Sequence, residues 1–173
     1  MAVKTGSLFD NLEQLGSGGS FIDEIANMLE RADMFRDLSR QDVEALAKYV
    51  TAYSAPTDAK VLIEGGRESY MFVVAEGKID VLKYSYESGE EKRLATVRAG
   101  KTVGEMSILD GMPHSASAKV VNPARLLLVT KRNFDCFIDD YPEVALKVIR
   151  KIAILMSLRL RQTSGVLLDH LQS

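Results

Sequence analysis

The sequence has little of the chemistry that disulfides, metal clusters and nucleophilic catalysis require. Its 173 residues include one cysteine, Cys136, and two histidines, His114 and His170. A single cysteine excludes an intrachain disulfide, and so few sulfur and imidazole groups leave little material for a transition-metal site. Phe134, Phe137 and Ile138 flank Cys136. We therefore expect a buried thiol in a reducing, cytoplasmic compartment.

The sequence also lacks an excess of one charge and a long apolar run. It has 22 basic and 24 acidic residues, a net charge of −2, whereas nucleic-acid-binding proteins are usually strongly basic. The longest apolar run, near Ile152–Leu158, is far shorter than the ~20 residues that a bilayer span needs. Asp10 and Glu13 interrupt the first twenty residues, which excludes a secretory signal. With 46% hydrophobic residues, the composition is typical of one globular domain.

Residues 1–19 are interpreted as an N-terminal arm and linker, and residues 20–54 as helices. Leu8, Phe9, Leu12 and Leu15 have the spacing of a short amphipathic helix, and Gly16–Gly19 is typical of a flexible linker. The arm is either a frayed terminus or a segment that packs on a neighbour or partner. Two helix starts follow, at Ser20 with Asp23 and at Ser39 with Asp42, and both resemble capping boxes.

Residues 55–130 read as short β-strands separated by turns. No helical pattern lies between these strands, so the pattern favours an antiparallel sandwich or barrel over a parallel α/β sheet. The predicted strands are Val61–Ile63, Tyr70–Ala75, Ile79–Leu82, Leu94–Val97, Ala116–Val121 and Leu126–Val129.

Residues 131–173 return to helix. Thr130 is suited to cap a short helix, and Pro142 begins a long one that runs at least to Gly165. From Pro142 to Ser164 it would measure ~35 Å. Its apolar stripe is wide enough to pack on the strands and on a second copy, which predicts a homodimer through residues 142–164.

One segment, Val103–Ala118, carries the most chemistry. Gly104-Glu105 followed by small and apolar residues suggests a short helical turn whose free N–H groups can receive an anion. A carboxylate there can accept hydrogen bonds from a diol. The alternative is a connecting loop in which Glu105 is solvated or caps a helix.

The segment resembles the phosphate-binding cassette of the cyclic-nucleotide-binding domain family. The surroundings match too, from Phe35–Leu38 through Gly65-Gly66 before the Tyr70–Val74 strand to Glu76-Gly77 and the long closing helix. The resemblance covers about Met34 to Gly165. It implies a mainly β fold, a jelly-roll-type β-roll (double-stranded β-helix) with N-terminal helices and a long C-terminal helix, as in catabolite-activator-like regulators and kinase regulatory subunits.

The resemblance also implies roles for residues. Gly104 and Glu105 would meet the ribose 2′-hydroxyl, the backbone N–H groups of Met106 and Ser107 would lie beside them, and Ser115 would give its N–H or hydroxyl to the phosphate. On the long helix, Thr163 and Ser164 resemble the residues that reach the base in bacterial regulators; the alternative is a fraying helix end near Gly165.

The sequence departs from the family in two places. His114 stands where the family has a phosphate-clamping arginine, and a lost charged hydrogen bond would weaken binding about tenfold to a hundredfold. Lys119 and Arg67 are either substitutes or solvated charges. No helix-turn-helix segment follows the long helix, so direct DNA binding is not expected. The basic residues of that helix are read as a solvated face: Lys147, Arg150, Lys151, Arg159 and Arg161.

Two functions remain open. The first is a cyclic-nucleotide-binding regulatory module that binds cAMP or cGMP, without a cofactor, and signals through its long helix. The alternative is a degenerate, nucleotide-free domain that serves dimerisation or binds a protein partner, because of His114. No catalytic triad, P-loop, metal motif or dinucleotide fingerprint is present, so we expect no enzyme.

Overall fold

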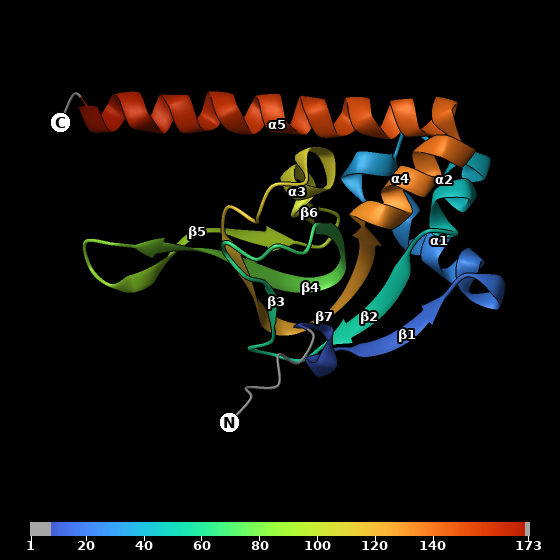
Figure 1. Cartoon of the computed structure of the whole chain (residues 1–173), viewed down its shortest axis with the longest axis horizontal. Helices are drawn as coiled ribbons and strands as arrows, with labels where there is room; N and C mark the ends of the chain where they lie inside the picture. Colours follow the sequence, from blue (N-terminus) through green and yellow to red (C-terminus); the bar gives the residue numbers. More distant parts are fainter. Residues whose placement is uncertain (1–7, 172–173) are drawn as a thin grey trace.

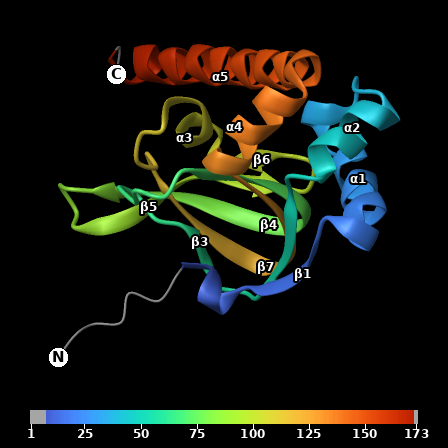
Figure 2. The same ribbon diagram turned by 45° about the vertical axis from the view of Figure 1, so that its right-hand side comes forward.

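The computed structural model describes residues 8–171, with side chains at residues 9 and 11–165. A rolled sheet of strands carries helices α1 and α2 at one end, and the long helix α5 crosses above it (Figure 1). The short helices α3 and α4 lie between α5 and the strands, which the turned view confirms (Figure 2). Within residues 8–171, no helix is both long and apolar enough to cross a bilayer.

The described strands form one antiparallel sheet in the order β1-β2-β7-β4-β5, with β3 pairing β7 and β6 pairing β4. This confirms the mainly β fold with flanking helices. The strands are β1 (Glu13–Ser17), β2 (Thr51–Ala55), β3 (Lys60–Leu62), β4 (Tyr70–Ser85), β5 (Glu90–Arg98), β6 (Thr102–Val103) and β7 (Ser117–Thr130).

Two apolar clusters hold the fold together, and the alternation of the strands separates them. In β4, Met71 and Val73 pack with the helices, whereas Tyr70, Phe72 and Val74 fill the inside of the roll. Because successive side chains of a strand point to opposite faces, one strand supplies both clusters. This explains why β4 reads as a continuous apolar run rather than an alternating one.

Two pairs of predicted strands are in fact single strands. Tyr70–Ala75 and Ile79–Leu82 are parts of β4, and Ala116–Val121 and Leu126–Val129 are parts of β7. The turn signals mark bends, because the β4–β7 register shifts on both sides of Glu76. Gly77, at φ 90°, is required there: a Cβ would lie 2.7 Å from Ala124 Cβ and 2.8 Å from Pro123 O.

The helices begin mostly where the sequence indicates. Ser39 and Asp42 form the expected capping box of α2, whereas the predicted box at Ser20 is wrong because Phe21 occupies the N-cap of α1 without a side-chain hydrogen bond. The helices are α1 (Ile22–Glu30), α2 (Arg40–Ala47), α3 (Glu105–Asp110), α4 (Lys131–Asp140) and α5 (Pro142–Leu171), with 3₁₀ turns η1 (Leu8–Asn11), η2 (Gly19–Phe21) and η3 (Asp33–Phe35).

Helix α4 corrects the expectation for the cysteine. Thr130 Oγ1 accepts the Asn133 N–H at 3.2 Å, so the predicted cap is confirmed. Phe134 and Phe137 are buried, but Cys136 is exposed. Residues three apart share a helix face, and Cys136 falls on the opposite one. Apolar neighbours in sequence therefore did not indicate burial.

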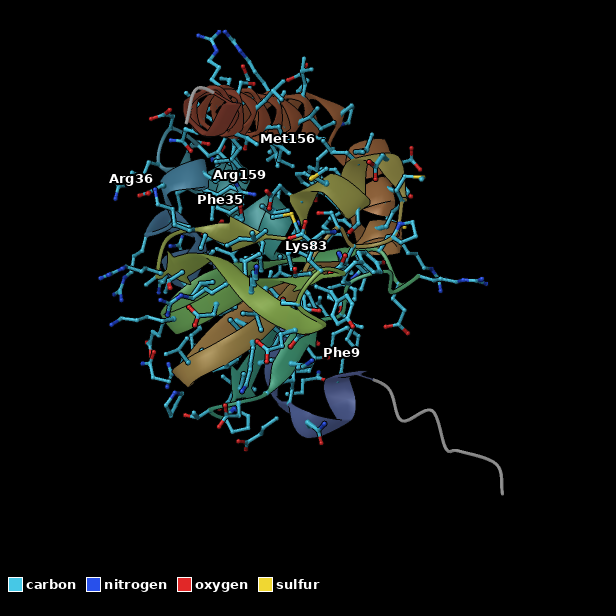
Figure 3. The ribbon with its side chains drawn as sticks, turned by 90° about the vertical axis from the view of Figure 1, so that its left-hand side faces the viewer. Phe9, Phe35, Arg36, Lys83, Met156 and Arg159 are labelled. Atoms are coloured by element: carbon cyan, nitrogen blue, oxygen red, sulfur yellow. The ribbon has the colours of Figure 1, made fainter. Side chains whose placement is uncertain are left out.

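The N-terminal arm packs on its own domain from residue 8 onward. It forms η1 and then β1, which pairs with β2, instead of the short amphipathic helix and the flexible glycine linker predicted there. The Phe9 ring stacks on Tyr53 at 5.9 Å and meets Tyr70 edge-on at 5.1 Å between centroids (Figure 3). Leu12 is buried beside it. The arm thus covers one side of the cluster inside the roll.

Shortening Phe9 to alanine is expected to destabilise the domain by about 2 kcal/mol, less than the ~3–5 kcal/mol of a fully buried ring because Phe9 is half-buried. Thermal unfolding should show a midpoint lower by roughly 4–8 °C. Asn11→Ala, an exposed position in the same turn, is the control. Equal midpoints for the two variants would mean that the arm does not contribute to the core.

Candidate functional site

A cavity of about 430 Å³ opens between the strands, α3 and α5. Its volume is in the range of small-molecule sites. All six residues assigned to sugar and phosphate line it, together with Thr163, whereas Ser164 is not among the lining residues and its Oγ donates to Leu160 O at 2.9 Å. The lining is Leu62, Val81, Leu94, Ala95, Val97, Val103, Gly104, Glu105, Met106, Ser107, His114, Ser115, Ala116, Arg159, Gln162 and Thr163.

The turn before α3 depends on glycine. Gly104 has φ 84° and ψ 7°, the left-handed region, and a Cβ there would lie 2.6 Å from Tyr70 O. The Ser107 hydroxyl lies 3.0 Å from Gly104 O and 3.2 Å from Tyr70 O, so it holds the turn against β4. The sequence prediction of a helical turn here is confirmed, and the turn brings Glu105 to the cavity.

Glu105 is a buried carboxylate, 1% exposed, with one oxygen bound and one unbound. Its Oε1 accepts a hydrogen bond from Arg159 Nη1, and Arg159 Nη2 also donates to Thr102 O at 3.1 Å. Its Oε2 is buried and has no hydrogen-bond partner among the described residues. A buried carboxylate oxygen without a donor is costly, and because this atom has almost no accessible surface, a ligand hydroxyl would reach it only after neighbouring side chains move.

Arg159 is the charged cavity residue that sequence reasoning missed. The interpretation of the basic residues as a solvated face is incomplete for it, since it reaches from α5 towards the roll (Figure 3) and pairs with buried Glu105 at the cavity, although its side chain is 44% exposed. Burial lowers the pKa of Arg159, but a guanidinium remains charged at neutral pH. The usable signal was its position four residues before Thr163, which places both on one face of the helix.

Two other basic residues of α5 also have partners. Lys147 Nζ donates to Asp42 Oδ2 at 2.7 Å, and Lys151 pairs with Asp37. Both pairs fasten the first turns of α5 to the region of α2 and η3. These lysines are paired, but ion pairs this accessible to water add little to stability, so they agree with a solvated face.

His114 is buried, 5% exposed, and its ring meets Tyr70 edge-on at 4.7 Å. Burial lowers the pKa of His114 below its ordinary value, partly offset by an interaction with the Glu68 backbone, so the ring is neutral at pH 7. Its Nε2 has no hydrogen-bond partner among the described residues. It therefore lines the cavity as a polar group without charge.

Neither candidate substitute for the missing arginine lies in the cavity lining. Lys119 pairs with Asp58 at 2.6 Å, and Arg67 is exposed. The charged side chains of the lining are Glu105 and Arg159, which bind each other. Among the described residues, the cavity wall thus carries no net charge.

Known proteins that are similar to this chain include two bacterial proteins whose names refer to cyclic AMP. The chain is 28% identical over 134 residues to the cyclic AMP receptor protein of Thermus thermophilus, covering 78% of this chain and 60% of that protein. It is 27% identical over 148 residues to a CRP-like cAMP-activated global transcriptional regulator of Mycobacterium tuberculosis, covering 86% and 62%. The chain thus spans about 60% of the length of these relatives.

Among solved structures, a cyclic nucleotide-binding domain from Methylobacillus flagellatus superposes with a TM-score of 0.82 and 28% identity, over 96% of this chain and 93% of that one. The sequence model of the cyclic nucleotide-binding domain matches residues 52–141, just over half of the chain. This range holds the bent strands, the Gly104 turn, Glu105 and His114. By its fold, its cassette and this match, the chain belongs to the cyclic nucleotide-binding domain family.

Proposed function

We propose that the chain is a regulatory module that binds a cyclic nucleotide, cAMP or cGMP, in the 430 Å³ cavity. One observation carries the proposal: Glu105 Oε2 and His114 Nε2 are buried, lack partners among the described residues, and belong to side chains that line the same cavity. Buried polar atoms are nearly always hydrogen-bonded in folded proteins. A ligand hydroxyl would satisfy Glu105 Oε2, and a ligand phosphate oxygen would satisfy His114 Nε2 once that nitrogen takes up a proton.

In this proposal Glu105 accepts the ribose 2′-hydroxyl beside Gly104. The backbone N–H groups of Met106 and Ser107, with Ser115 opposite, surround the cyclic phosphate, and His114, protonated when the phosphate binds, gives it the Nε2 N–H. Thr163 lies at the cavity and would reach the base, with Ser164 following it on the helix. The similarity to cAMP-responsive bacterial regulators makes cAMP the first ligand to test.

Arg159 would transmit binding to α5. It connects the helix to Glu105 and to Thr102 O, so a ligand that contacts Glu105 changes the contacts of the helix as well. A ligand with different affinities for two helix positions shifts the population towards the one it prefers. Signalling through α5 then needs no catalytic step, and none is proposed.

Isothermal titration calorimetry with cAMP and with cGMP tests the proposal, beside thermal unfolding with each ligand. We expect binding heat and a higher midpoint with at least one ligand, since a ligand that binds only the folded state stabilises it. Adenosine 5′-monophosphate, which lacks the ring phosphodiester, is the control ligand. Neither heat nor stabilisation at millimolar cyclic nucleotide would overturn the proposal.

The exposed side of α5 supports a homodimer. Leu146 and Leu160 are 67% and 69% exposed and Ala153 is exposed too; with Ile149 and Met156, which are partly buried against the domain's own core, they follow the three-and-four spacing of a coiled-coil seam. The seam continues to Thr163 at the cavity, so a second copy packed there would lie close to the ligand. We propose this dimer, with a cytoplasmic location and a protein partner as the further parts of a regulatory role.

Replacing Leu160 with aspartate is expected to convert the dimer to a monomer, because the charge would lie in an apolar seam. Sedimentation velocity at micromolar concentration measures the change, and Gln162→Glu, which adds a charge off the seam, is the control. A wild-type protein that sediments as a monomer, or a Leu160→Asp variant that remains dimeric, would contradict a dimer through α5.

The second candidate is a nucleotide-free dimerisation or interaction module. Neutral His114 in place of a charged phosphate ligand favours it, because the wall then carries no net charge for an anion. It predicts an α5 dimer that gives no heat with cAMP or cGMP. The calorimetric titration with cAMP and cGMP therefore distinguishes the two functions.

A further inference from the structure

The proposed function assigns the cyclic phosphate to the part of the cavity at His114 and Ser115, here called the phosphate end. A lysine lies just outside the cavity lining at this end. Lys83 lies on β4, and its Nζ donates to Ser115 O at 2.6 Å. Ser115 lines the cavity next to His114. Figure 3 shows Lys83 on the strand side of the molecule, below the α5 residue Arg159. Lys83 therefore places a positive charge at the point where the wall of the cavity is neutral.

The present partner of Lys83 holds it weakly. Nζ also pairs with Glu64, whose other oxygen accepts the Tyr84 N–H at 3.1 Å. The Lys83 and Glu64 side chains are 45% and 24% exposed. Ion pairs this accessible to water add little to stability, so exchange of one anionic partner for another is inexpensive. The flexible four-carbon stem of lysine allows Nζ to move without moving the strand.

A cyclic phosphate carries one negative charge, and its burial requires a counter-charge. Arg159 is already bound to Glu105, and His114 is uncharged in the free protein. The Ser115 carbonyl would also repel a phosphate oxygen, and Lys83 covers that carbonyl. Of the cations whose contacts the structure describes, Lys83 is the one bound to a residue of the phosphate end.

We propose that Lys83 binds the ligand phosphate in place of the missing arginine, leaving Glu64 while it remains near Ser115. Glu64 then acts as a competitor that holds Lys83 in the absence of ligand. The inference rests on the proposed function, since it names the residue that would make the neutral cavity fit an anion. It predicts that loss of the Lys83 charge weakens cAMP binding and that loss of the Glu64 charge strengthens it.

The test measures cAMP affinity by calorimetry for Lys83→Gln, Glu64→Gln and the wild type. We expect Lys83→Gln to weaken cAMP binding about tenfold to a hundredfold, the effect of a charged hydrogen bond. Glu64→Gln should tighten it, because the competitor is lost while the amide still accepts the Tyr84 N–H. Lys78→Gln, an exposed lysine of the same strand, is the matched control and should leave affinity unchanged.

Adenosine, which has the sugar and base without phosphate, separates phosphate binding from a general change of the cavity. Lys83→Gln should reduce cAMP affinity and leave any adenosine affinity unchanged. If adenosine does not bind, the test is whether Lys83→Gln lowers cAMP affinity while Glu64→Gln raises it. Melting curves verify folding. Equal cAMP affinities for Lys83→Gln and Lys78→Gln, or weaker binding by Glu64→Gln, overturn the role of Lys83 alone. A wild type that binds no cyclic nucleotide overturns the proposed function and this inference with it.

Discussion

The wild-type protein is expected to bind cAMP about tenfold to a hundredfold more tightly than 2′-deoxy-cAMP, and Glu105→Ala should abolish that preference. The reason is the buried Glu105 Oε2, which has no partner among the described residues and which the proposed function assigns to a ribose hydroxyl. A ligand without the hydroxyl leaves this oxygen unsatisfied. Competition against a fluorescent cAMP analogue measures all four affinities.

The comparison of the two ligands isolates one hydrogen bond. Removal of Glu105 also frees Arg159 and lowers the negative charge near the phosphate, and those effects apply equally to both ligands. Their affinity ratio therefore reports the contact between the carboxylate and the 2′-hydroxyl alone, as in a double-mutant cycle. A ratio that stays above tenfold in Glu105→Ala would show that another residue reads the sugar.

Asp110→Asn provides the matched control for this variant. Asp110 is exposed, ends α3, and lies outside the cavity lining, and an asparagine still accepts the Met112 N–H that its Oδ1 accepts at 2.9 Å. It removes one negative charge from the same short helix. We expect the preference for cAMP over 2′-deoxy-cAMP to be unchanged in Asp110→Asn.

Features determined by neighbouring residues were predictable from the sequence. The Gly104-Glu105 turn, the Ser39 capping box and the start of α5 at Pro142 each depend on contacts within about one helical turn. The resemblance of the segment to the family cassette placed the six residues between Gly104 and Ser115 together, and all six line one cavity. Local sequence predicted the turn, whereas its anchorage to Tyr70 O on β4 is a tertiary contact.

Contacts between distant segments were not predictable in this way. Arg159 meets Glu105 across 54 positions, and the helix pattern alone did not distinguish it from the exposed Arg161. The neutral state of His114 depends on its burial, to which the edge-on Tyr70 ring of β4 contributes a neighbour at 4.7 Å. Lys83 reaches Ser115 only because β4 and β7 pair. The ion pairs and charge states of the site could therefore be derived only from the three-dimensional structure.

At the bends of β4 and β7 the sequence showed turn residues, but only the tertiary structure revealed that they bend the strands rather than end them. Gly77 and Pro123 are ordinary turn residues, and each predicted the end of a strand. In the roll they face each other, with Pro123 O 2.8 Å from where a Gly77 Cβ would be. The strands continue through both bends because each pairs with the other along its length.

His114→Arg is expected to increase cAMP affinity about tenfold to a hundredfold, since it restores a charged phosphate donor. The arginine side chain is longer than histidine and must extend into the cavity, because Tyr70 already fills the space beside the ring. Calorimetric titration with cAMP measures the gain. A variant that melts like the wild type but binds no more tightly would contradict a phosphate at this position.

The pH dependence of binding should change in the same variant, and its sign follows from the charge on His114. Burial lowers the pKa of His114 in the free protein, and a bound phosphate would raise it, so binding takes up a proton. Wild-type affinity for cAMP should therefore rise as the pH falls from about 7.5 to 5.5. In His114→Arg the affinity should be flat over this range, because arginine stays charged, and in the control His170→Gln it should still rise.

The stability of the unliganded protein should change in the opposite direction. Because the pKa of His114 is lower in the folded protein than in the unfolded chain, the unfolded chain binds more protons as the pH falls through about 6.5, the ordinary histidine value. The wild type without ligand should therefore melt earlier below that pH, while cAMP binds it more tightly. The buried His114 imidazole thus predicts that, as the pH falls, cAMP affinity rises while the stability of the unliganded protein decreases. In His114→Arg, where the charge is fixed, position 114 should contribute to neither change.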